Sequence, residues 1–139
     1  MVSFSIYPDK ANDELYFMVR VLDTRPKMYA HARKAWERMY DTPMVKDFEA
    51  ICFFHARYTT EEELHACAGE VLFYKGMVRA YMVAHEMLHC AMFYDKLKFN
   101  KRGIYKGIAG TDEERLCETL DGLVKQFHEN IHKRGVFIN

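Results

Sequence analysis

The sequence lacks several features that would assign it to a class at once. Its 20 basic and 20 acidic side chains balance to a formal net charge of zero. Domains that bind nucleic acids carry a basic excess that attracts phosphates, so no nucleic-acid partner is expected here. No apolar run reaches the roughly 20 residues that a membrane-spanning helix needs, so no membrane association is expected either.

An export signal and paired cysteines are also missing. The first residues, MVSFSIYPDK, contain no basic segment followed by a long apolar stretch, so they predict no secretory signal. The cysteines form no C-x-x-C pair and lie among apolar residues, which is typical of reduced core thiols. The sequence therefore predicts a cytoplasmic protein (in the host cytoplasm if a phage encodes it) with four free cysteines: Cys52, Cys67, Cys90 and Cys117.

The composition itself favours a folded domain. Half of the 139 residues are hydrophobic and 14% are aromatic, which is enough to bury one core. No repeat, low-complexity tract or linker divides the chain. We therefore expect a single domain over residues 1–139.

The hydrophobic spacing changes along the chain between the period of a strand and that of a helix. This alternation predicts an α+β fold. The segment 77–98 is apolar nearly all round, so we expect that helix to be buried. The expected strands are 3–7, 15–21, 47–58 and 69–76, and the expected helices are 27–40, 77–98 and 112–133.

Two H-E-x-x-H strings stand out, HEMLH at 85–89 and HENIH at 128–132. Histidines four residues apart lie on one face of a helix and can bind one Zn²⁺ through their imidazole nitrogens. A glutamate next to the first histidine can take a proton from the attacking water. Either string is therefore a candidate zinc site.

The flanking residues favour the first string. HEMLH lies between the apolar runs YMVA and CAMFY, where unpaired imidazoles and a carboxylate would be costly to bury. A shared metal ion would offset that cost. HENIH contains Asn130 and is followed by Lys133 and Arg134, and its histidines lie on the polar stripe of the expected helix. We expect this second string to be a solvated face.

His85-Glu86-x-x-His89, placed after a strand-rich part and before a helix rich in acidic residues, resembles the zincin metallopeptidases. The likeness covers about residues 69–125. It is closest to small gluzincin-type members, which include phage and bacterial proteins of unassigned role. This resemblance implies a minimal zincin-like domain, with a small sheet, a buried active-site helix and a C-terminal helix packed on it. It also implies that 69–76 is an edge strand along which a peptide substrate binds.

In function, the resemblance implies a zinc-dependent peptidase that acts on a peptide or protein. His85 and His89 would be zinc ligands and Glu86 the general base. A third ligand would come from a glutamate on the following helix. Similar proteins place that glutamate one turn before a small residue; here Cys117 is the small residue and Glu114 the matching ligand.

Other candidates for the site stay open. On a helical wheel Glu113 lies nearer the apolar face than Glu114, which makes it the alternative third ligand. Asp121 is a candidate hydrogen-bond acceptor for a ligand imidazole. Asp95 falls where metzincins have a third histidine. Because Met92 stands in place of their turn-forming glycine, the helix should continue, and Asp95 should point away from His89. Residues that could stabilise an oxyanion or bind substrate are Tyr94, Tyr105, His55 and His65.

Two other functions compete with the peptidase. The pairs Glu86-x-x-His89 and Glu129-x-x-His132 match the E-x-x-H pairs of di-iron carboxylate bundles, with Glu37 or Glu49 as further ligands. The strand-like segments, however, leave few long helices for a bundle. The other alternative is a zincin fold that binds another protein without turnover.

Overall fold

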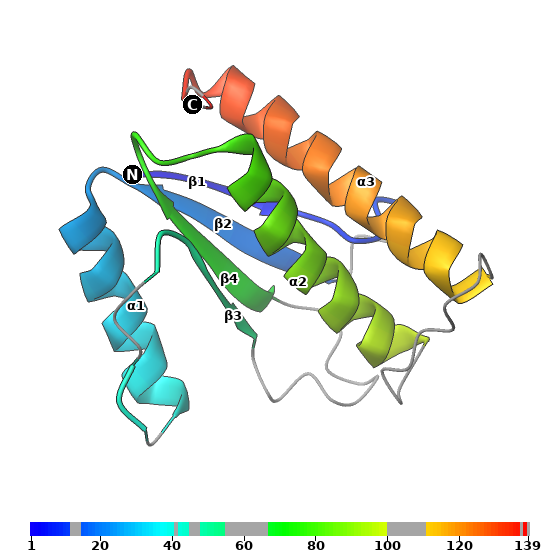
Figure 1. Cartoon of the computed structure of the whole chain (residues 1–139), viewed down its shortest axis with the longest axis horizontal. Helices are drawn as coiled ribbons and strands as arrows, with labels where there is room; N and C mark the ends of the chain where they lie inside the picture. Colours follow the sequence, from blue (N-terminus) through cyan, green and yellow to red (C-terminus); the bar gives the residue numbers. More distant parts are fainter. Residues whose placement is uncertain are drawn as a thin grey trace.

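Four strands form one mixed sheet in the order β1-β2-β4-β3 (Figure 1). The computed structural model describes residues 1–11, 15–40, 42–44, 48–54, 67–99, 111–136 and 138. Together with three helices in this described part, the sheet confirms the predicted α+β class. The strands are β1 (Val2–Ile6), β2 (Tyr16–Leu22), β3 (Ile51–Phe54) and β4 (Cys67–Tyr74), and the helices are α1 (Arg25–Met39), α2 (Ala80–Lys98) and α3 (Thr111–Lys133).

The strand at the edge of the sheet is not the predicted one. β4 pairs in parallel with β2 on one side and antiparallel with β3 on the other, so it lies inside the sheet. Leu72 and Phe73 point to opposite faces of the sheet and are both buried. Because both faces of β4 are covered, its sequence is apolar over most of its length. The prediction that 69–76 is an edge strand was therefore wrong. The edge strands of the described sheet are β1 and β3, and β3 lies within the segment expected at 47–58.

The helices cover the sheet from both sides (Figure 1). On one face, Met28 and Ala32 of α1 pack against Leu72 and Phe53. On the other face, α2 and α3 cover the larger cluster, which includes Phe17, Val19, Val71, Phe73, Met87, Leu123 and Phe127. The sheet is thus the middle layer, and α1 is separated by it from α2 and α3.

An ion pair fixes the end of α2 against the start of α3. Arg115 Nε donates to Asp95 Oδ1 over 2.7 Å, and Asp95 is fully buried. The Arg115 guanidinium also lies over the ring of Phe99, 4.4 Å from its centroid. Because the last turns of α2 meet the first turns of α3, the two helices run antiparallel. The C-terminal helix packs on the helix that carries HEMLH, as expected.

α2 is buried on one side only. Val83, Met87 and Cys90 face the core, whereas Tyr81, Leu88 and Met92 are exposed. The expectation of a helix buried all round was therefore wrong. The apolar residues on its outer side are covered by neither the sheet nor α3. No helix among the described residues is both long and apolar enough to cross a membrane.

The position of β3 depends on Gly69 of β4. A Cβ at Gly69 would collide with the backbone carbonyl oxygen of Phe53, whereas a Cβ at Gly122 of α3 would meet open space. We expect Gly69→Ala to push β3 away from β4 and to destabilise the fold by more than about 2 kcal/mol. Gly122→Ala should stabilise it by about 0.5–1 kcal/mol through helix propensity. Urea unfolding of both variants tests this, and a Gly69→Ala protein as stable as the wild type would contradict it.

Candidate metal centre

The two imidazoles of HEMLH converge. His85 and His89 lie one turn apart on α2, and their Nε2 atoms are 3.1 Å apart. Their ring centroids are separated by 4.8 Å at an interplanar angle of 78°. In the metal-free protein one Nε2–H can donate to the other Nε2. This separation also leaves both nitrogens within reach of one shared metal ion.

This separation fits a shared zinc ion. Two nitrogens bound to one tetrahedral zinc at about 2.0–2.1 Å lie about 3.3 Å apart. The observed 3.1 Å is close to that value, so little side-chain movement is needed for both rings to bind the same metal. The separation of the two nitrogens is thus compatible with chelation.

Both histidines are exposed, contrary to the expectation that they lie in a buried helix. The rotation of α2 explains this. Phe93, one turn after His89, stacks on Phe54 of β3 with ring centroids 4.5 Å apart and planes 7° apart. Met87 is buried and lies about 160° around the helix from His85, so His85 is left on the outer side of α2.

Glu86, in contrast, is buried between α2 and the edge strand. Only 7% of its surface is exposed. The Cys52 thiol of β3 donates a hydrogen bond to its Oε2 over 2.8 Å. The carboxylate beside the imidazole pair is therefore held by a contact that joins α2 to β3.

Burial keeps the Cys52 thiol protonated. Desolvation raises its pKa well above the usual range for cysteine, and the neighbouring Cys90 thiol and Glu86 carboxylate raise it further. A thiol that stays protonated at neutral pH remains a hydrogen-bond donor. Cys52 therefore remains a hydrogen-bond donor to the Glu86 carboxylate at neutral pH.

The structure does not bring Glu114 to the imidazoles. Glu114 precedes Arg115, which pairs with Asp95, and Asp95 lies six residues beyond His89 on α2. At about 1.5 Å and 100° per residue, this is about 9 Å along the axis and about 120° around it. Among the described residues, no group of three His, Cys, Asp or Glu could hold a metal. We therefore no longer propose Glu114 as the third ligand.

The other acidic residues predicted on α3 also form no group of three metal-binding side chains with the imidazoles. Glu113, Cys117 and Asp121 are exposed. The choice of Glu114 rested on a close helix approach at Cys117, and an exposed cysteine provides no such contact. The mistake came from the sequence pattern, because TDEERLCETLD fits either side of an amphipathic helix until its packing partner is known.

Asp95 and Tyr94 have structural partners. Asp95 pairs with Arg115, so it points toward α3, as expected for a residue away from the metal. Tyr94 is 6% exposed and meets the exposed ring of Phe99 edge-on. The remaining candidates, His55, His65 and Tyr105, lie outside the described residues.

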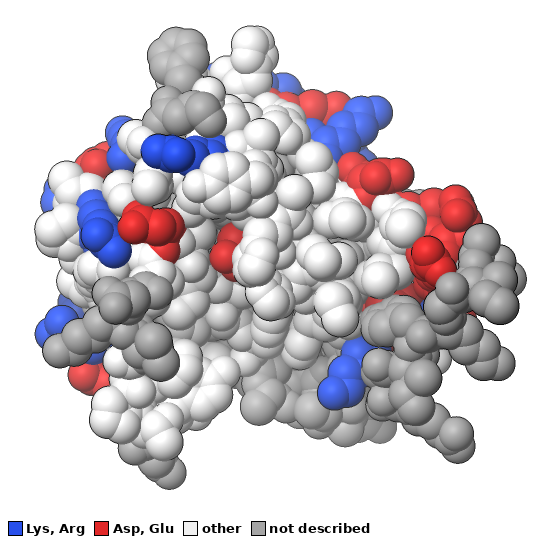
Figure 2. Space-filling model, in the orientation of Figure 1, with Lys and Arg blue, Asp and Glu red and all other residues white. Residues whose placement is uncertain are grey.

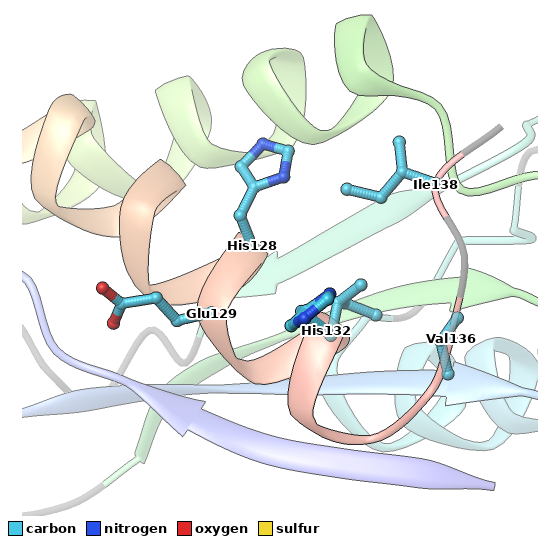
Figure 3. A pocket seen from close by; sticks show the side chains of 6 residues that line it. His128, Glu129, His132, Val136 and Ile138 are labelled. Atoms are coloured by element: carbon cyan, nitrogen blue, oxygen red, sulfur yellow. The ribbon is translucent and has the colours of Figure 1, made fainter.

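The second string borders an open pocket of about 480 Å³ (Figure 3). His128 is half-buried and His132 is exposed, and apolar side chains complete the wall. Figure 3 shows the His128 ring directed toward the side of α2 and His132 beside the C-terminal segment, while Glu129 points away from that segment. This string is thus not merely a solvated face, but its side chains diverge. The lining residues are His128, Glu129, Ile131, His132, Val136 and Ile138.

The fold gives no support to a di-iron bundle. Glu86 faces β3, whereas Glu129 is exposed on α3, so the two E-x-x-H pairs do not face one another. Glu37 lies on α1, across the sheet, and Glu49 accepts a hydrogen bond from Tyr74 over 2.6 Å. The described helices do not enclose these carboxylates in one core.

Sequence reasoning missed Cys52 as a member of the site. The strand pattern allowed Cys52 and Phe54 to share one face, because alternate residues of a strand do so. It did not say that this face meets α2, since the two segments are more than 30 residues apart in the chain.

No family model, no curated protein and no solved structure matches this chain. The resemblance to zincins therefore rests on the motif and its surroundings.

The four thiols should differ sharply in reactivity. Cys117 is exposed, Cys90 is fully buried, and burial raises the pKa of both Cys52 and Cys67. In the native protein we expect one thiol to react quickly with an aromatic disulfide reagent and three to react only slowly. Cys117→Ser should abolish the fast phase and Cys52→Ser should leave it intact. A fast phase that survives Cys117→Ser would contradict the assigned burial.

Proposed function

We propose that this protein is a zinc-dependent hydrolase of peptide bonds, with His85 and His89 as zinc ligands and Glu86 as general base. The observation that carries the proposal is the 3.1 Å separation of the two imidazole nitrogens beside a carboxylate held in place by β3. The peptide substrate follows from the resemblance to zincins.

Each residue of the motif has a distinct task. When bound, zinc would polarise the scissile carbonyl and make water a better nucleophile. His85 and His89 would fix the position of the zinc ion, because both project from the same face of a rigid helix. Glu86 accepts the thiol hydrogen of Cys52 at Oε2, so Oε1 is the oxygen that would receive a proton from the attacking water.

The exposed position of the imidazoles favours a polymeric substrate. A site on the outer flank of α2 can be reached by a peptide segment within a larger protein, whereas small-molecule sites are usually enclosed. Zinc hydrolases use three protein ligands. The third one here can be sought by alanine substitution at His55 and His65, with Glu114 as the comparison.

One observation favours the alternative of a metal-binding protein without turnover. Glu86 is more than nine-tenths buried and already hydrogen-bonded, which limits its access to water. Under this alternative zinc would bind as proposed, but no peptide would be cleaved. Zinc binding and hydrolysis therefore need separate measurements.

Zinc binding should depend on the first string and not on the second. We expect His85→Ala and His89→Ala to lose bound zinc on dialysis, because each removes one of two converging nitrogens. His128→Ala and His132→Ala form a matched control pair with the same spacing on α3. Elemental analysis of the four variants is the measurement. Equal loss in all four would contradict the assignment of the site to α2.

Replacing the carboxylate should separate binding from catalysis. Glu86→Gln keeps the shape of the side chain and removes the base, so zinc content should stay unchanged while hydrolysis falls by at least about 100-fold. Cleavage of an unstructured protein such as casein, followed by fluorescence, measures the rate. Hydrolysis by the Gln variant at the wild-type rate would eliminate Glu86 as the base.

A further inference from the structure

One face of the sheet is covered by two helices and the other face by one. α2 and α3 cover the larger cluster, whereas α1 packs on Leu72 of β4 and Phe53 of β3. On the α1 face, β1 presents Ser3 and Ser5, because these alternate with the buried Phe4. Ser3 is exposed and Ser5 is half-buried. The face of the sheet beside α1 is therefore open over β1.

This open strip has the width of a helix. Neighbouring strands lie about 4.8 Å apart and a helix with its side chains is about 10 Å wide, so one helix covers about two strands. α1 lies over β4 and β3, which leaves β1 and most of β2 for a second helix. The opposite face holds such a pair of helices in α2 and α3.

The flank of α1 that borders the open strip is basic. On this flank, His31 Nε2 lies 3.3 Å from Glu70 Oε1, and the same oxygen accepts a 2.6 Å hydrogen bond from Arg20 Nε of β2. Arg20 in turn lies opposite Ser3 of β1. Four basic residues follow one another along the flank at steps of four, three and four residues, within about 60° of one another. We call this set the α1 basic stripe: Lys27, His31, Lys34 and Arg38.

The α1 basic stripe keeps a net positive charge. Lys27 shares the carboxylate of Asp23 with Lys75 and with the amino terminus. In the part of the chain that the structure describes, Lys34 and Arg38 form no ion pair with a carboxylate. The surface that this charge attracts is an acidic one.

α3 carries the opposite charge on its outer side. Glu114, Glu118 and Asp121 are exposed and follow one another at steps of four and three residues, again within about 60°. Figure 2 shows acidic side chains gathered over the first half of α3. Among the described residues, the ion pairs of α3 are made by Arg115, so these three carboxylates are unpaired there. We call them the α3 acidic stripe.

The two stripes match in spacing and differ in sign. Both advance by four residues and then by three, so each acidic side chain meets a basic one when the two helices lie side by side. Within one chain the sheet keeps α1 and α3 apart (Figure 1). We propose that copies of this chain associate head to tail, with α3 of one copy lying along the α1 basic stripe of the next, over the open strip.

The contact suits a protein of zero net charge. Copies that carry a large net charge repel one another, and this chain carries none. Exposed ion pairs are weak and are screened by salt, so we expect a dissociation constant of about 0.1–1 mM at low salt and monomers at high salt. A head-to-tail contact leaves one stripe unused at each end, so it builds open chains of copies. The contact uses no residue of the proposed zinc site, so it can fail without affecting the proposed function.

Sedimentation equilibrium of the full-length protein, at low salt and at about 0.5 M salt, tests the contact. Lys34→Glu with Arg38→Glu inverts the charge of the α1 basic stripe. Glu114→Lys with Glu118→Lys inverts that of the α3 acidic stripe. A fourfold variant with all these changes regains both the complementarity of the stripes and the zero net charge.

The matched control is Arg79→Glu with Lys96→Glu. Both positions are exposed and lie toward the two ends of α2, outside the stripes. The control changes the net charge by the same amount as Lys34→Glu with Arg38→Glu, so it measures the association lost through net charge alone. Circular dichroism checks that each variant folds. Should a double variant unfold, Lys34→Glu and Glu118→Lys alone test the same contact.

We expect the average mass of the wild type to rise with concentration at low salt and to stay that of the monomer at about 0.5 M salt. Each double stripe variant should raise the dissociation constant by at least about 10-fold more than the control does, because like charges then face one another. The fourfold variant should associate as the wild type does. Zinc content should be the same in all these proteins, because none of the changes touches HEMLH.

The inference is overturned by a wild type that stays monomeric at low salt, or by association that persists at about 0.5 M salt. It is also overturned by double stripe variants that associate as strongly as the control, or by a fourfold variant that stays monomeric. A mass that rises only to twice that of the monomer would mean a closed dimer, and would overturn the head-to-tail contact.

Discussion

The contact between β3 and α2 sets the rotation of α2, and the rest of the site depends on that rotation. The stacked rings of Phe54 and Phe93 and the hydrogen bond from Cys52 to Glu86 hold one side of the helix against the edge strand. Because successive helix positions differ by about 100°, fixing Glu86 inward also fixes His85 and His89 on the adjoining outer flank. One packing contact thus buries the carboxylate of the motif and exposes its imidazoles.

The second constraint is the antiparallel packing of α3. The buried Asp95 carboxylate would be costly without Arg115, so this pair ties the start of α3 to the end of α2. Gln126, farther along α3, exchanges hydrogen bonds with the backbone of Tyr7, which follows β1. α3 therefore lies toward β1, whereas the imidazoles lie on the flank of α2 turned away from α3. This placement, more than any property of the acidic residues, keeps Glu114 from the candidate metal.

The sequence predicted local features and missed those that depend on distant packing. The aromatic and β-branched runs predicted β1 and β2 closely, and the amphipathic period predicted α3, because these signals arise within a few residues. The outward side of α2 was missed, since Tyr81, Leu88 and Met92 are as apolar as its core residues. The sheet order was missed too, because no short-range sequence signal indicates that β3 pairs with β4 at the edge of the sheet. Within the site, the motif residues were identifiable, but their exposure and the role of Cys52 were not.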